Sequence, residues 1–288
     1  PVVIFPAMNE KMFENKATQE NIKILSERGI NIISPSEGEL ACGISGKGRM
    51  PEPEEIMHEI LKFLCPVKDL KGKKILVTAG PTHEYLDPVR FISNPSSGKM
   101  GVAMARSAWY RGAEVKIICG PVKIDSYGFE VIKIISAKDM LNAVINNLEW
   151  ADFIIKAAAV GDYRIKEFQG EKIKREGKNI LTLELVQNPD IASEVGKLKR
   201  PGQVLIGFAA ETENLISNAR EKLKRKNLDY ILANDVSGEN TGFAADTNIL
   251  RLIAAEEKNK KNENEGEKIF SGLKQDIALE IWDYVMSH

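Results

Sequence analysis

The sequence has few of the features that mark secreted, membrane or nucleic-acid-binding proteins. Its three cysteines, Cys42, Cys65 and Cys119, lie too far apart to indicate a disulfide framework, and they suit a reducing cytoplasm. No apolar run approaches the ~18 residues that a membrane-spanning helix requires, and no signal-peptide pattern is present. A net charge of −1 provides no basic field for nucleic acid. We therefore expect a cytoplasmic protein with no membrane and no nucleic-acid partner.

Histidine is also scarce, and the three histidines cannot by themselves assemble a metal cluster. The rest of the composition, with 43% hydrophobic and 28% charged residues, is that of a globular protein. A length of 288 residues allows one large or two modest domains. Because the first residue is Pro1 and the chain begins inside a strand-like run, we expect it to be a fragment of a longer polypeptide.

Apolar strands alternate with amphipathic helices along the chain. Before a linker-like segment at 65–72, we expect strands at 2–5 and 30–33, helices at 15–28 and 54–64, and a glycine-rich loop at 36–50. After it, we expect strands at 74–78, 114–119, 130–135, 152–157, 203–207 and 229–233, helices at 98–111, 137–149, 190–197, 213–227 and 271–286, and hairpins at 172–185 and 247–270. This alternation predicts an α/β fold with a Rossmann-like, mostly parallel sheet, helices on both faces and a β-hairpin extension.

A long polar loop joins the strand at 74–78 to the helix that follows. It carries Arg90 and Asn94 and ends with Ser96, Ser97, Gly98 and Lys99 at the start of the helix. Unpaired backbone N–H groups and the helix dipole favour a phosphate there, and a guanidinium and an amide nearby can meet a carboxylate or phosphate. A helix capped by a serine, with nothing bound, is the alternative.

Two common phosphate-binding motifs are absent from this loop. A Walker A loop requires glycine at position 93 and serine or threonine at position 100, where this chain has Ser93 and Met100. The G-x-G-x-x-G fingerprint of dinucleotide-binding proteins is also missing after the strand at 74–78.

Four more motifs follow later strands of the expected sheet. They are residues 156–163 with Asp162, residues 172–175 with Lys172 and Lys174, residues 207–212 with Phe208, and residues 233–236 with Asn234 and Asp235. Ligands of open α/β sheets bind at the carboxyl ends of strands. There Asp162 can hold ribose hydroxyls or a metal ion, and Phe208 can pack on a flat base; a turn or cap role for Asp162 is the alternative.

The two lysines favour an anion if they share one face of a strand, whereas solvated surface lysines are the alternative. Together with the polar loop, the four later motifs predict a single nucleotide-sized cleft. In the N-terminal part, Cys42 lies in a glycine-rich loop that can fold over a ligand, with the thiol as acid, base or clamp. A small buried thiol is the alternative.

The order of these motifs resembles a known family. The matching segments are 80–84 (GPTHE), 87–90 (DPVR), 94–101 (NPSSGKMG), 157–164 (AAAVGDYR), 172–174 (KIK), 207–212 (GFAAET) and 233–235 (AND). The series resembles phosphopantothenate–cysteine ligase, the C-terminal half of the bifunctional coenzyme A biosynthesis proteins. In the N-terminal part, 6–9 (PAMN) and 41–50 (ACGISGKGRM) resemble the substrate motif and clamp of phosphopantothenoylcysteine decarboxylase.

The resemblance implies a two-step ligation. The carboxylate of 4′-phosphopantothenate attacks the α-phosphate of CTP to give an acyl-cytidylate and pyrophosphate, and the amine of cysteine then displaces CMP. Mg²⁺ would bridge the triphosphate and offset its charge. The residues do not decide between CTP and ATP, but the bifunctional forms favour CTP.

The resemblance also implies roles for single residues. Asn94 would hold the acyl-cytidylate for attack by cysteine, Arg90 would grip phosphopantothenate, and Lys172 would activate the nucleotide. Further nucleotide contacts are implied for Ser96, Ser97, Gly98, Lys99, Asp162, Lys174, Phe208, Asn234 and Asp235, a substrate contact for Ala159, and a metal contact for Asp162. The family motif K-x-K-K ends here in Arg175, which preserves the charge.

The decarboxylase resemblance covers only part of that enzyme. It implies a flavodoxin-like domain in which FMN oxidises the cysteinyl group, with Asn9 at the substrate and Cys42 as the reductive residue. The FMN-binding segment and a catalytic histidine would precede Pro1, so we do not expect residues 1–66 to decarboxylate alone. Residues 67–288 would form the ligase, homodimeric through the 247–270 hairpin, with higher assembly through the decarboxylase half. The rival interpretations are an NAD(P)-dependent reductase and a non-catalytic nucleotide-binding module.

Overall fold

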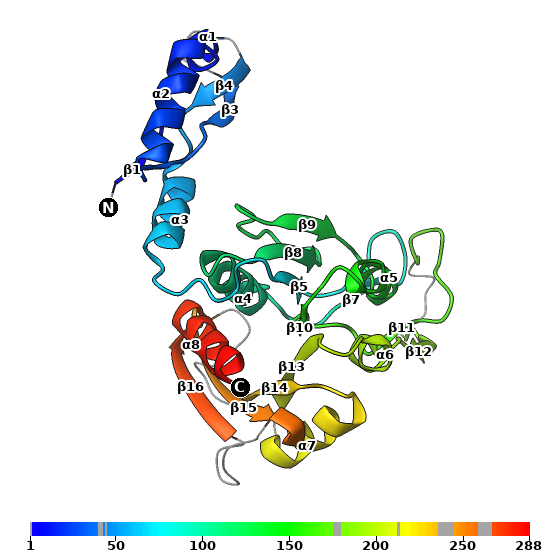
Figure 1. Ribbon diagram of the computed structural model, residues 1–288. Coiled ribbons are helices and arrows are strands. Elements are labelled where there is room, and N and C mark those ends of the chain that lie inside the picture. Colours follow the sequence, from blue (N-terminus) through cyan, green and yellow to red (C-terminus); the bar gives the residue numbers. More distant parts are fainter. Residues whose placement is uncertain are drawn as a thin grey trace. The chain divides into compact units, whose positions relative to one another are not determined.

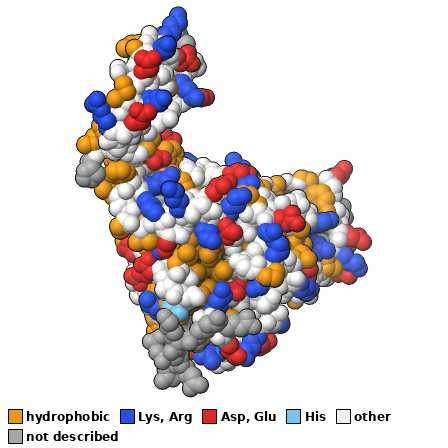
Figure 2. Space-filling model, viewed as in Figure 1, with side chains coloured by type: hydrophobic (Ala, Val, Ile, Leu, Met, Phe, Trp, Pro, Cys, Tyr) orange, Lys and Arg blue, Asp and Glu red, His pale blue; other side chains and the backbone are white. Residues whose placement is uncertain are grey.

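The computed structural model divides the chain into two compact units, Pro1–Val67 and Lys68–His288 (Figure 1). It describes residues 2–39, 43, 45–174, 180–211, 214–235, 245–258 and 267–288; the side chains at 39, 211, 235 and 257 are not described. None of the described helices combines the length and apolar character needed to cross a membrane. On the face shown in Figure 2, acidic and basic side chains are interspersed.

The N-terminal unit is a small α/β assembly. Strands β1 (Val3–Ile4) and β2 (Asn31–Ile32) pair in parallel, with helices α1 (Glu10–Phe13) and α2 (Lys16–Glu27) between them. Helix α2 has Arg28 as its C-cap and is followed by Gly29, whose φ of 82° is the left-handed conformation typical of the residue after a helix. Helix α3 (Pro53–Leu64) begins with proline at its first position and a capping box of Glu52 and Glu55.

The glycine-rich loop expected at 36–50 is instead an antiparallel hairpin of β3 (Ser36–Glu39) and β4 (Ser45–Arg49). Gly48 allows this hairpin to lie close to the segment at Met8, because its carbonyl accepts a hydrogen bond from the backbone N–H of Met8 (2.9 Å) and a Cβ at Gly48 would lie 2.1 Å from the Met8 oxygen. Cys42 lies outside the described residues.

The second unit is organised around an eight-stranded sheet with the order β16-β15-β14-β13-β10-β5-β8-β9. Its parallel strands are β5 (Lys74–Ala79), β8 (Glu114–Cys119), β9 (Glu130–Lys133), β10 (Phe153–Lys156), β13 (Val204–Glu211) and β14 (Tyr230–Asp235). Numbered along the chain, these strands have the spatial order 3-2-1-4-5-6, which is that of the Rossmann fold. The predicted α/β class and parallel sheet are confirmed.

Helices cover both faces of this sheet. Those of the unit are α4 (Lys99–Tyr110), α5 (Ala137–Leu148), α6 (Ile191–Leu198), α7 (Leu215–Arg225) and α8 (Lys274–Ser287). Along β10, Ile154 packs in the core beneath α5, α6 and α7, whereas Phe153 contacts Trp282 of α8 edge to face. Because successive strand residues point to opposite faces, α8 lies on the other side of the sheet. Helix α4 joins it there, since the Trp282 indole N–H donates to the Met104 carbonyl (3.1 Å).

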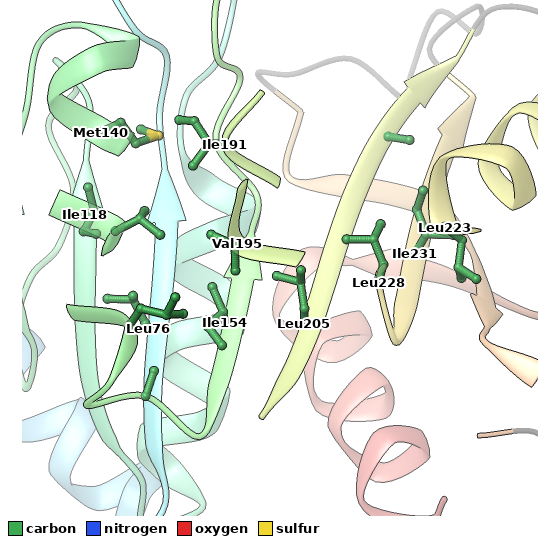
Figure 3. Packing of buried hydrophobic residues seen from close by; sticks show 14 of the residues in the cluster. Leu76, Ile118, Met140, Ile154, Ile191, Val195, Leu205, Leu223, Leu228 and Ile231 are labelled. Carbon is green, nitrogen blue, oxygen red and sulfur yellow. The ribbon is translucent and has the colours of Figure 1, made fainter. Parts of the chain in front are cut away.

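The main core lies between the central strands and α5–α7 (Figure 3). Leu76, Ile154 and Leu205 extend from three adjacent strands and are fully buried, as are Met140 of α5 and Val195 of α6. This apolar layer packs β5 and β10 against the helices and so fixes the position of both strands.

Of the two predicted hairpins, only the second is confirmed. Strands β15 (Thr247–Ala254) and β16 (Glu267–Leu273) extend the sheet beyond β14, with a short 3₁₀ helix at Glu256–Lys258 after β15. The hairpin expected at 172–185 is not formed by the described residues, because 172–174 and 180–184 lie in no strand and β12 (Leu185–Gln187) pairs with β11 (Tyr163–Ile165). The turn expected at 176–179 lies outside the described residues.

Lys172 and Lys174 therefore do not lie in a strand, and the argument that they share one strand face fails. The backbone between them is bonded to side chains of the polar loop rather than to a neighbouring strand. That loop contains its own short ladder of β6 (Glu84–Tyr85) and β7 (Phe91–Ile92).

Candidate active site

A cleft of about 500 Å³ lies at the carboxyl edge of the parallel strands. The end of β10 lines it, and β10 and β5 are the neighbours at which the strand order reverses. In Rossmann-like sheets the chain leaves such strands in opposite directions and opens a crevice for ligands. The cleft is lined by residues 94–101, 156–162, 187–192 and 208–210, and by Lys222, Lys226, Asn234, Asn248, Leu250 and Lys274.

Three glycines shape the connection from β5 to α4. Gly80 (φ 76°) turns the chain at the end of β5, and Gly98 (φ 74°) is the N-cap residue of α4. A Cβ at Gly98 would lie 3.3 Å from the Gly80 nitrogen, and one at Gly101 would lie 2.8 Å from the Ala79 Cβ. A tight turn, an open helix N-terminus and close helix–strand packing are the roles of the three glycines in a dinucleotide fingerprint. Here a long insertion separates the first from the other two, so the linear motif is absent.

We expect Gly101→Val to destabilise the protein, because the added side chain forces α4 away from β5. The free energy of unfolding measured in urea should fall by about 2 kcal/mol or more. Gly170→Val is the control, since Gly170 has nothing within 4 Å of its Cβ position. Equal effects of the two substitutions would contradict the close packing described for Gly101.

The loops after β5 and β10 are joined by hydrogen bonds. The Ala159 N–H donates to the Gly80 carbonyl (2.9 Å), and the Gly161 N–H donates to the Thr82 hydroxyl (2.9 Å). The exposed Asn94 side chain donates from Nδ2 to the Val160 carbonyl (3.0 Å). This contact places Asn94 beside the run of small residues and at the edge of the cleft.

Asp87 organises the rest of the polar loop and is fully buried. Its Oδ1 accepts from the backbone N–H groups of Val89 and Arg90 (both 2.8 Å). Its Oδ2 accepts from Arg90 Nη1 (2.6 Å) and from the Ile173 N–H (3.1 Å), and Arg90 Nη1 also donates to the Ile173 carbonyl (3.2 Å). Burial acts to raise the pKa of Asp87, but the backbone N–H donors and the guanidinium outweigh it and lower that pKa to about 2.

Arg90 therefore joins the polar loop to the segment that carries Lys172 and Lys174. The sequence interpretation did not select Asp87 as a site residue. The signal was present, because an Asp followed by proline is typical of a turn in which the carboxylate accepts the next backbone N–H groups.

The cleft has an excess of positive charge. Among the described lining residues there are five lysines and two acidic residues, Asp162 and Asp190. One lysine, Lys226, is paired with Asp190 (3.0 Å), and Lys99 is paired with Asp246 (2.6 Å) outside the lining. With the N-terminus of α4 opening on the same space, the cleft suits a ligand with several negative charges.

The structure brings most of the predicted site residues into this cleft. Asn94, Ser96, Ser97, Gly98, Lys99, Ala159, Asp162, Phe208 and Asn234 line it. Arg90, Lys172 and Lys174 are not among the lining residues. Asp235 ends β14, but its side chain is not described. Asn9 belongs to the N-terminal unit, where it caps α1 by accepting from the Lys11 N–H (2.9 Å).

The metal assignment is limited to Asp162, whose side chain is exposed at the cleft. Among the described residues, no group of three or more His, Cys, Asp or Glu side chains could hold a metal ion. Magnesium carried by a nucleotide needs only one or two carboxylates, because phosphate oxygens and waters complete its shell. The cleft therefore suits a magnesium ion that is held mainly by the phosphates of a bound nucleotide.

Comparison with known proteins agrees with this division of the chain. A family described as "DNA/pantothenate metabolism flavoprotein C-terminal domain" matches residues 70–287, and a family described as "Flavoprotein" matches residues 1–65. The chain is 47% identical over 254 residues to the coenzyme A biosynthesis bifunctional protein CoaBC of Haemophilus influenzae, covering 88% of this chain and 63% of that protein. The chain thus spans less than two thirds of the length of that relative.

Two further proteins that are similar to this chain have different names. A cysteine/cysteine sulfinic acid decarboxylase from an unknown prokaryotic organism is 45% identical over 259 residues, covering 88% of this chain and 72% of that protein. The crystal structure of the C-terminal domain of a coenzyme A biosynthesis bifunctional protein CoaBC superposes with a TM-score of 0.61 at 37% identity, covering 76% of this chain and 97% of that one.

Proposed function

We propose, since this chain belongs to the DNA/pantothenate metabolism flavoprotein C-terminal domain family, that residues 67–288 ligate 4′-phosphopantothenate to cysteine with CTP. The observation that carries the proposal is the cleft itself. It combines an open helix N-terminus, an excess of lysines and the amide of Asn94 at the carboxyl edge of one sheet. Groups that can bind phosphate and an amide that can bind an acyl intermediate therefore lie in the same cleft.

The proposed reaction has two steps. A carboxylate oxygen of phosphopantothenate forms a bond to the α-phosphorus of CTP, and the bond to pyrophosphate breaks. The cysteine amine then attacks the acyl carbon, the bond to CMP breaks, and the amine loses a proton as the amide forms. The first step is needed because an unactivated carboxylate is a poor acylating agent.

Each part of the cleft has a task in this scheme. Backbone N–H groups at Ser96–Lys99 hold phosphate oxygens, and Asn94 orients the acyl intermediate. Asp162 holds the ribose or the magnesium that offsets phosphate charge, and Phe208 lies against the base. Arg90 and Asp87 hold the Lys172–Lys174 segment beside the polar loop. These lysines do not line the cleft, and their assignment to the nucleotide rests on the family resemblance.

We propose that residues 1–66 are the C-terminal part of a flavoprotein decarboxylase, with Asn9 and Cys42 at its substrate. FMN would supply oxidation of the cysteinyl group in a longer polypeptide.

We also propose a ligase homodimer formed through β16. This strand is the edge of the sheet and exposes Ile269 and Leu273. Exposed edge strands readily pair with another chain. A monomeric mass in light scattering at micromolar concentration would contradict this assignment.

Pyrophosphate release tests the ligase proposal. The chain is incubated with CTP, Mg²⁺, 4′-phosphopantothenate and cysteine, with each component omitted in turn and with ATP in place of CTP. Release that requires phosphopantothenate supports the proposal. Binding of CTP without turnover would favour a nucleotide-binding module, and oxidation of NADPH would favour a reductase. Release of CO₂ from cysteine would favour the decarboxylase activity that the name of one similar protein states.

A further inference from the structure

Lys156 occupies a position that the proposed reaction leaves without a task. It is the last residue of β10, between Thr78 of β5 and Gly207 of β13, at the point where the strand order reverses. The residue lines the cleft but is only 8% exposed. Its Nζ is buried, and none of the described residues accepts a hydrogen bond from it.

The charged groups that face Lys156 come from two helices. Asp190 is the N-cap residue of α6, and Lys226 is the C-cap residue of α7. Asp190 is engaged by both Lys226 (3.0 Å) and the Ser193 N–H (3.1 Å). Neither of the strand residues paired with Lys156 is charged. They are Thr78, whose hydroxyl donates to the Ile155 carbonyl (3.4 Å), and Gly207.

A buried amine without an acceptor is costly to the folded protein. Burial lowers the pKa of Lys156 to about 7; Asp190 acts in the opposite direction and Lys226 adds to the lowering. The amine therefore gives up its proton far more readily than that of an ordinary lysine. An apolar side chain would fill the same space at lower cost. Because Lys156 lines the cleft and no described residue accepts from its amine, a ligand in the cleft can supply the missing acceptor.

We propose that Lys156 Nζ is a binding group for the polyphosphate of the ligand in this cleft. A phosphate oxygen supplies the acceptor that none of the described residues provides, and binding is accompanied by uptake of a proton at Lys156. This inference rests on the proposed function for the identity of the ligand as a nucleotide. The anionic character of the ligand rests independently on the other four lysines among the described lining residues, Lys99, Lys222, Lys226 and Lys274.

The sign of the pH dependence follows from protonation. Below pH 7 the free protein already carries the ammonium, so binding is strongest there. Above pH 7 each binding event must also bind a proton, and the dissociation constant should rise by up to about tenfold per pH unit through this group. Comparing wild type with Lys156→Met at each pH removes the contribution of the nucleotide's own ionisation.

The experiment measures CTP binding by calorimetry, without phosphopantothenate or cysteine, in two buffers of different ionisation enthalpy at pH 8. We expect Lys156→Met to weaken binding about tenfold or more and to abolish an uptake of close to one proton seen in wild type. Lys138→Met, at an exposed position of α5, is the control and should change neither quantity. The Lys156→Met protein should also unfold at a higher temperature than wild type when no ligand is present.

Each outcome decides a different point. If Lys156→Met binds CTP with wild-type affinity and proton uptake, the inference is wrong, even if ligation slows. If wild type binds inorganic tripolyphosphate through Lys156 but does not bind CTP, the anion site stands and the proposed function fails. If wild type binds neither probe, both are overturned.

Discussion

Replacing Asn94 with alanine should stop the second step of the proposed ligation while leaving the first intact. The side chain lies at the edge of the cleft, held by its bond from Nδ2 to the Val160 carbonyl. An amide in that place can donate to charge that develops on the acyl group as cysteine attacks. Loss of one such donor lowers rates by about 10²–10³-fold.

The expected signature is an imbalance between the two steps. In rapid-quench reactions of Asn94→Ala, pyrophosphate release in the first turnover should match wild type, and acyl-cytidylate should build up while little amide forms. Asn147→Ala is the matched control, because Asn147 also donates to a backbone carbonyl (Ala143, 2.9 Å) but lies on α5 away from the cleft. Amide formation at the wild-type rate would show that Asn94 does not act in the second step.

Asp87→Asn should lower the rate of ligation although Asp87 is not among the residues that line the cleft. Asp87 accepts hydrogen bonds from Val89, Arg90 and Ile173, and an asparagine amide presents an N–H₂ where one oxygen accepts. The link between the polar loop and the lysine segment should loosen. Because a small displacement of binding groups costs about 10²-fold in rate, we expect ligation to fall at least that much, with a lower melting temperature.

The pH dependence of stability gives this prediction a second test. The folded pKa of Asp87 is about 2, below the ordinary value of 3.8. A carboxylate with a depressed pKa stabilises the fold above its unfolded pKa, and that contribution disappears as the pH falls from about 4 to about 2. The stability difference between wild type and Asp87→Asn should therefore be constant above pH 5 and shrink in that window. A difference that does not change with pH, or one matched by the exposed Asp276→Asn, would contradict the role assigned to Asp87.

The sheet could be predicted from the sequence because burial on both faces leaves a local signature. Each parallel strand is a short apolar run, and each expected range overlaps an observed strand. The hairpin of β15 and β16 was predictable for a similar reason, since two apolar runs flank a polar connection. The 172–185 hairpin failed because the partners of Ile173 are Asp87 and Arg90, more than eighty residues earlier, and no local pattern records such contacts.

The polar loop from β5 to α4 also combines features that the sequence reveals with contacts that form only in the folded chain. Its sequence alone indicated an anion site at Ser96–Lys99, because a helix N-terminus and small residues are local features. That Gly80, Gly98 and Gly101 meet as in a dinucleotide fingerprint was decided by the tertiary structure, since a long insertion separates them in the chain.

By itself, then, the sequence determined the alternation of strands and helices, the family, and the strand-end motifs that predict one cleft. Only the tertiary structure decided which side chains line that cleft, and it placed Arg90 on the buried Asp87 and Lys156 without an acceptor among the described residues. The physical reason is that propensity and hydrophobic period act over a few residues. Burial and hydrogen bonding at the edge of a parallel sheet depend on segments that meet only when the chain folds.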